Sequence, residues 1–138
     1  VDLSGSITDQ AIALAVIDSL DELVADQTAE LDARSTTLVD SIRALLPDWT
    51  IRRPRGGIVT SAELPNGSAE AFCDHAGRFG VQVASGRQFT PGVFDDRHVR
   101  LPFTADETVL RTAVERLAAA WATFEPHHVA PRPAIIAG

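Results

Sequence analysis

The stretch RHVRLPFTADETVLRTAVERLAAAW, residues 97–121, decides the fold, because a strand pattern changes into a helix pattern within it. Alternation with period two places Val99, Leu101 and Phe103 on one apolar face and turns Arg100 to the other. The sequence therefore predicts a strand with one buried face. It also raises the question of what an arginine does on the opposite face.

The second half of the same stretch predicts the last helix, because its apolar residues recur at helical spacing. Thr104 and Glu107 are three residues apart at its start, which is the spacing of a capping box. We therefore expect the helix to begin at these residues. The stripe expected to face the core consists of Val109, Leu110, Ala113, Val114, Leu117, Trp121 and Phe124.

Residues 6–46 read as mostly helical, with Ser6 and Thr8 as candidate N-caps. The expected apolar stripes are Ile12, Val16, Leu20 and Leu23, then Leu31, Leu38, Ile42, Leu45 and Leu46. Prolines and glycines then mark turns between shorter elements. These elements are a short strand at Ile51, a strand at 58–64, a helix at 68–80 capped by Ser68, a strand at 81–85 and a loop up to residue 96.

This order of elements predicts an α+β fold, with a small, mainly antiparallel sheet and helices packed on one of its faces. The other sheet face is then either solvated or covered by something outside this chain. We expect one domain over residues 1–124 and a proline-rich tail over 125–138.

Composition narrows the class of protein. The chain has 138 residues, is 45% hydrophobic and carries a formal net charge of −7, which argues against direct binding to nucleic acid. No apolar run is long enough to span a membrane, and the single Cys73 is consistent with a reducing cytoplasm. All twelve basic residues are arginine. A chain that starts at Val1 and lacks methionine is expected to be processed or, as we favour, a piece of a longer polypeptide.

Three segments together resemble a known family: RPRGGIVTSAELPNG, AGRFGVQVASGRQFTPG and VRLPFTADETVLRTAVERLAAAW. Their order is similar to the C-terminal part of fold-type I pyridoxal-phosphate enzymes, the class I/II aminotransferases. The resemblance spans residues 8–124. LLPDW at 45–49 and RLPFT at 100–104 make it most similar to the aminotransferase-like domain of MocR regulators of the GntR family. Ser85 departs from the pattern, since a proline is usual before Gly86.

What the resemblance implies for Arg100 is contact with the α-carboxylate of an amino-acid substrate or ligand. A guanidinium has paired donors that match the two oxygens of a carboxylate, so the chemistry agrees. The alternative is a surface arginine paired to Asp95 or Asp96, or stacked on a neighbouring strand. Gly56 and Gly57 either let the backbone approach a ligand or only form a turn.

The resemblance also implies that pyridoxal phosphate is held by a large domain upstream in the same polypeptide. Because a Schiff base requires an amine and this chain has no lysine, we expect no catalysis by the chain alone and no cofactor bound to it. The parent is expected to be a cytoplasmic homo-oligomer, usually a dimer, whose winged-helix domain binds DNA. A true aminotransferase is one alternative. A free-standing module for small-molecule binding or dimerisation is the other.

Other candidates have simpler interpretations. Arg52, Arg53 and Arg55 are expected to form a solvated turn, and Arg87 is a weaker ligand candidate in the glycine-containing loop. Cys73 lies on an apolar helix stripe and is expected to be a buried, unreactive thiol. His75, His127 and His128 lack the further ligands that a zinc site needs, so no metal site is predicted.

Overall fold

The computed structural model describes residues 6–89 and 96–125. In chain order the elements are α1 (Ile7–Ile17), α2 (Leu20–Leu45), β1 (Thr50–Ile51), β2 (Val59–Glu63), α3 (Ala69–Gly77), β3 (Ala84–Ser85), the 3-10 helix η1 (Gly86–Phe89), β4 (His98–Pro102) and α4 (Glu107–Thr123). The strands form one sheet in the order β1-β2-β4-β3, and every neighbouring pair is antiparallel. The predicted α+β fold is confirmed.

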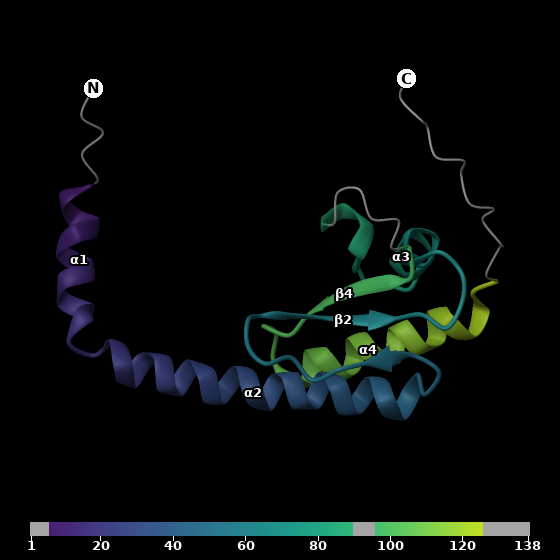
Figure 1. Cartoon of the computed structure of the whole chain (residues 1–138), viewed down its shortest axis with the longest axis horizontal. Helices are drawn as coiled ribbons and strands as arrows, with labels where there is room; N and C mark the ends of the chain where they lie inside the picture. Colours follow the sequence, from purple (N-terminus) through teal and green to yellow (C-terminus); the bar gives the residue numbers. More distant parts are fainter. Residues whose placement is uncertain (1–5, 90–95, 126–138) are drawn as a thin grey trace, which may run out of the picture.

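The core lies between the sheet and the pair of helices α2 and α4, which run along one of its faces (Figure 1). Val99 of β4 is fully buried, and Leu101 and Phe103 are each only 2% exposed. Thr60 of β2 lies opposite Leu101 in the sheet and is also buried. The alternation in β4 therefore works as predicted, with one face in the core and Arg100 on the other face.

An aromatic cluster closes the core where α3 meets α4. Trp49, Phe72, Trp121 and Phe124 lie edge-on or tilted to one another. The ring centroids of Trp49 and Phe72 are 5.3 Å apart, and those of Phe72 and Trp121 are 5.4 Å apart. Such edge-to-face packing adds attraction beyond the burial of apolar area. It joins the turn after α2 to both later helices.

Two of the predicted helix starts are confirmed by their capping bonds. The Ser6 hydroxyl accepts a hydrogen bond from the amide of Asp9, and the Ser68 hydroxyl accepts one from the amide of Ala71. A serine in this position satisfies an N–H group that the first helical turn leaves without a partner. These bonds fix the starts of α1 and α3.

The predicted capping box at Thr104 and Glu107 is wrong. The N-cap of α4 is Asp106, whose side chain makes no capping hydrogen bond. The Glu107 carboxylate instead accepts a hydrogen bond of 2.8 Å from the Thr37 hydroxyl on α2. The Thr104 carbonyl accepts one from Arg34, also on α2. Contacts between α2 and α4 therefore replace the local bond that the sequence pattern suggested.

A helical arm, which we define as residues 6–33, projects from this body (Figure 1). No residue of α1 is buried. The large apolar residues exposed on the arm are Ile7, Ile12, Leu14, Val16, Ile17, Leu20, Leu23 and Val24. The arm also carries seven Asp and Glu residues and no Arg. Its first predicted stripe therefore has no partner among the described residues.

Smaller differences concern the edges of the pattern. Val109 was expected in the buried stripe of the last helix but is 54% exposed, and Leu45 of the second apolar stripe is 47% exposed. The strand expected over 81–85 pairs only at its last two residues, Ala84 and Ser85, although Val81 is buried. No helix among residues 6–89 and 96–125 is both long enough and apolar enough to cross a membrane.

Several sequence-based expectations lie outside the described residues. They are the structure of segment 90–95, which includes Asp95, and that of residues 126–138, which hold His127 and His128. The predicted tail over 125–138 also lies outside the described residues, apart from Glu125.

Candidate functional site

Arg100 lies on the sheet face opposite α2 and α4. Its neighbours across the sheet are Ser61 on β2 and Ala84 on β3, both with small side chains. The other side chains turned to this face include Glu63 and His98, which flank the sheet end nearer α3. Arg100 is half-buried, so part of the residue remains accessible on this face of the described structure.

Within residues 6–89 and 96–125, no carboxylate forms an ion pair with Arg100. Asp96 was one of the two carboxylates expected to pair with it, but its carboxylate accepts a bond from the amide of Glu70 at the start of α3. Instead, the guanidinium carbon of Arg100 lies 3.9 Å from the ring centroid of Phe89. A cation stacked on an aromatic face keeps its N–H groups free, because these point outward in the plane of the guanidinium.

The glycine pair lies in the loop between β1 and β2. Gly57 has a φ of +79°, which favours glycine, so the turn alone explains this residue. A side chain added at Gly56 or Gly57 would meet no atom within 4 Å. The backbone is therefore accessible from that side. The loop runs into β2, whose Val59 pairs with Pro102, two residues along β4 from Arg100.

The remaining arginines of interest have partners within the chain. Arg53 donates to both carboxylate oxygens of Asp32 on α2 at 2.9 Å, and so ties the glycine loop to that helix. Arg87 pairs with Glu70 on α3 at 3.1 Å. Both arginines are therefore paired with carboxylates of this chain and hold loops in place. Neither one needs the charge of a ligand to neutralise it.

Cys73 is half-buried on α3 and packs against the core. Burial, reinforced by the nearby carboxylates of Asp74, Asp96 and Glu70, raises the pKa of its thiol to about 11. At neutral pH the thiol is therefore protonated, and a protonated thiol is a poor nucleophile and a poor metal ligand. The interpretation as an unreactive thiol agrees with this environment.

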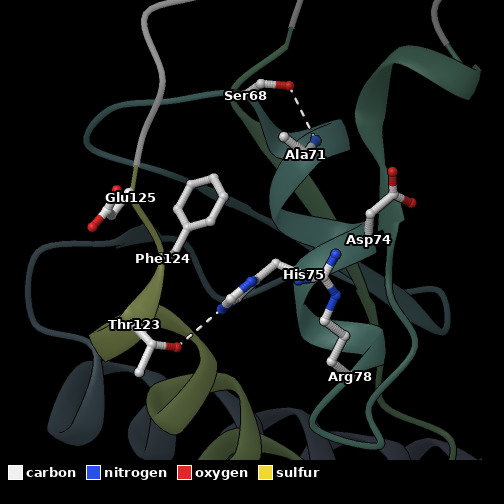
Figure 2. A pocket seen from close by; sticks show the side chains of 8 residues that line it. All are labelled: Ser68, Ala71, Asp74, His75, Arg78, Thr123, Phe124 and Glu125. Carbon is white, nitrogen blue, oxygen red and sulfur yellow. Dashed lines mark hydrogen bonds between the residues drawn. The ribbon is translucent and has the colours of Figure 1, made fainter.

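A hollow of about 320 Å³ lies elsewhere, between α3 and the end of α4 (Figure 2). In it, Nε2 of His75 lies 3.0 Å from the hydroxyl of Thr123. The residues that line it are Ser68, Ala71, Asp74, His75, Arg78, Thr123, Phe124 and Glu125. Its charges are of both signs, and none of the predicted ligand residues lines it. We therefore take the sheet face with Arg100, and not this hollow, as the candidate site.

The sequence motifs contained Phe89 but gave it no role, because its contact with Arg100 depends on how η1 folds. The interaction of His75 with Thr123 was also missed, since these residues are 48 positions apart. No group of three or more His, Cys, Asp or Glu side chains in the described part of the chain is arranged to hold a metal ion.

Comparison with known proteins gives a clear result only for structure. No model of a protein family matches the sequence, and no curated protein is significantly similar to it. The resemblance seen in the three short segments is therefore too distant for either comparison of sequences.

Solved aminotransferase structures do match. The kynurenine aminotransferase of Pyrococcus horikoshii is 22% identical with a TM-score of 0.78, over 86% of this chain and 31% of that chain. The α-aminoadipate aminotransferase LysN of Thermus thermophilus, solved with N-(5'-phosphopyridoxyl)-L-leucine, is 20% identical with a TM-score of 0.75, over 80% and 29%. The multiple substrate aminotransferase of Thermococcus profundus is 26% identical with a TM-score of 0.72, over 80% and 29%.

The chain therefore spans about three tenths of the length of the aminotransferases it matches. The expectation of an aminotransferase-like fold, made from the sequence, is confirmed over at least 80% of the chain in these three comparisons. Over that share of its length, the chain has the fold of one segment of an aminotransferase.

Proposed function

We propose that this chain is the C-terminal small subdomain of an aminotransferase-like protein, in which it forms a lid and wall of the ligand site. The observation that carries the proposal is the position of Arg100. Its guanidinium is on the sheet face that α2 and α4 leave open, and no carboxylate of the described residues neutralises it. The ligand proposed for it is the α-carboxylate of an amino acid.

The surroundings of Arg100 suit that ligand. Two parallel N–H donors match the two oxygens of a carboxylate, so a single arginine fixes both the charge and the orientation of the ligand. The side chains of Ser61 and Ala84 beside it are small. The glycine loop at Gly56 and Gly57 is also accessible, and it provides backbone that a ligand could approach closely.

The residues of this chain do not fit the cofactor itself. Pyridoxal phosphate is held covalently by a lysine amine, and all twelve basic residues here are arginine. We therefore assign the cofactor and its chemistry to the large domain of the parent polypeptide. The role of the present chain is to bind and orient the ligand and to exclude water. The large domain is thus its proposed partner, and we expect the parent to be a homo-oligomer.

For the parent we propose a MocR-type transcription regulator, on the basis of the segments LLPDW and RLPFT. In such a protein an upstream winged-helix domain binds DNA, and the aminotransferase-like part responds to an amino-acid ligand. The alternative is a true aminotransferase, the class of protein to which the solved neighbours named above belong. Turnover of amino acids by the full-length parent, or its absence, separates the two.

The test of the site compares Arg100→Lys with wild type in the full-length parent. Lysine keeps the charge but loses the paired donors, so amino-acid affinity should fall by about 1–3 kcal/mol, or roughly 5- to 150-fold, while affinity for pyridoxal phosphate is unchanged. Arg43→Lys is the matched control, since Arg43 is exposed on α2 and, among the described residues, pairs only with Asp40 on the same helix. Unchanged amino-acid affinity in Arg100→Lys would remove Arg100 from the site.

A second test uses the 138-residue chain alone. Titration with amino acids and with pyridoxal phosphate should give no saturable signal, because the proposal places half of the site in another domain. Saturable, stoichiometric binding of either compound would instead support a free-standing small-molecule-binding module and overturn the proposal.

A further inference from the structure

Phe89 is the last residue of η1, and its ring lies against Arg100. The guanidinium carbon is 3.9 Å from the ring centroid, although the Phe89 side chain is 55% exposed. An exposed phenylalanine gains little from apolar burial. Among the described residues, the interaction seen for the Phe89 ring is its contact with the Arg100 guanidinium.

The position of η1 is fixed at its first two residues. A side chain at Gly86 would place its Cβ 3.1 Å from Cβ of His98 and 3.2 Å from the His98 carbonyl oxygen, so η1 approaches β4 as closely as a glycine allows. The next residue, Arg87, pairs with Glu70 on α3 at 3.1 Å. These two contacts hold η1 between β4 and α3 and bring Phe89 to Arg100.

The stacking constrains the guanidinium without using its donors. The ring covers one face of the group, whereas the N–H bonds lie in its plane and point away from the ring. A free arginine side chain has many rotamers, and binding a ligand must restrict them. A guanidinium already stacked on Phe89 has fewer orientations left to lose when a carboxylate meets its N–H edge.

We propose that Phe89 is a positioning residue, which holds the guanidinium of Arg100 with its N–H edge toward the carboxylate of an incoming amino acid. This inference rests on the proposed function, because it needs Arg100 to bind that carboxylate. It adds a specific requirement: an aromatic ring at position 89. An aliphatic side chain of similar size fills the same space but does not attract the cation.

The first measurement uses NMR on the 138-residue chain and does not depend on any ligand. In the wild type, the ring current of Phe89 should shift the Arg100 side-chain protons, including Nε–H, upfield. Phe89→Leu should abolish that shift, and Phe89→Trp should keep or increase it. Val109→Ala, which removes a similarly exposed apolar side chain on α4, should leave it unchanged. Arg100 resonances that are the same in wild type and Phe89→Leu would overturn the proposal.

The second measurement uses the full-length parent. Phe89→Leu should weaken amino-acid binding by about two- to fivefold, the range expected for an exposed cation–π contact. Affinity for pyridoxal phosphate should stay the same, and Phe89→Trp should restore amino-acid binding. If Arg100→Lys weakens binding and Phe89→Leu does not, the positioning role is wrong while the proposed function stands. If Arg100→Lys has no effect, the proposed function itself fails.

Discussion

The helical arm permits a comparison of two identical substitutions on one face of one helix. Leu20 and Leu38 are eighteen residues apart on α2, which is about five full helical turns, so they lie on the same side of it. Leu38 is 3% exposed in the core, whereas Leu20 is 48% exposed on the arm. The helix, its face and the residue type are the same at both positions. The two leucines therefore differ in whether another element of the chain packs against them.

We expect Leu38→Ala to cost about 2–5 kcal/mol of unfolding free energy, because it removes buried methyl groups and leaves a cavity. For a folded unit of this size, a loss of about 3 kcal/mol lowers the Tm by roughly 10 °C. Leu20→Ala should change the free energy by no more than about 0.5 kcal/mol, as for other surface substitutions. Urea denaturation followed by the fluorescence of Trp49 and Trp121 measures both variants, since both rings lie in the aromatic cluster.

If Leu20→Ala lowers the free energy of unfolding of the isolated chain as much as Leu38→Ala does, our reasoning is wrong. The arm would then be covered already, and repeating the measurement over a range of protein concentrations would identify self-association as the cause. Of the seven carboxylates on each arm, Glu30 and Asp32 pair with Arg34 and Arg53 outside the arm, and the other five oppose the pairing of two arms. We therefore expect a stability that does not depend on concentration at low salt.

Three further outcomes are expected of the isolated chain. Since burial raises the pKa of Cys73 to about 11, the folded state holds its proton more tightly than the unfolded state does. The contribution of this thiol to stability should therefore be constant below about pH 9 and be lost between about pH 9 and 11, and Cys73→Ala should remove that loss in pH-dependent urea unfolding. Ser85→Ala should leave the free energy of unfolding unchanged or raise it by up to about 1 kcal/mol, because the buried Ser85 hydroxyl has no hydrogen-bond partner among the described residues. The Tm should change in the same direction. Gly57→Ala should cost about 1–2 kcal/mol in thermal unfolding, because its φ of +79° strains any other residue; an unaffected Tm would contradict that turn geometry.

The sequence predicts best those features that depend on neighbours along the chain. The capping serines Ser6 and Ser68 and the outward position of Arg100 all follow from local spacing, and the structure has all three as expected. Period-two alternation and a cap are properties of a few consecutive residues. Such features need no knowledge of what packs against them.

Predictions failed where a residue from a distant part of the chain provides the partner. The carboxylate of Glu107 bonds to Thr37, seventy residues earlier, so the local capping pattern was not used. The stripe Ile12, Val16, Leu20 and Leu23 has helical spacing as predicted, but α4 does not extend along this part of the chain, so the stripe is left exposed on the arm (Figure 1). The contact of Phe89 with Arg100 depends on the close approach of Gly86 to β4, which no local pattern reveals.

The two outer strands of the sheet, β1 and β3, are only two residues long. An unpaired strand edge is a template on which another polypeptide can add by backbone hydrogen bonds, and its length sets how many bonds that addition can form. Edge strands of two residues offer another polypeptide very few backbone hydrogen bonds. Addition of further strands at the edges of the sheet is therefore unfavourable, although the chain also carries a long helical arm with exposed apolar side chains.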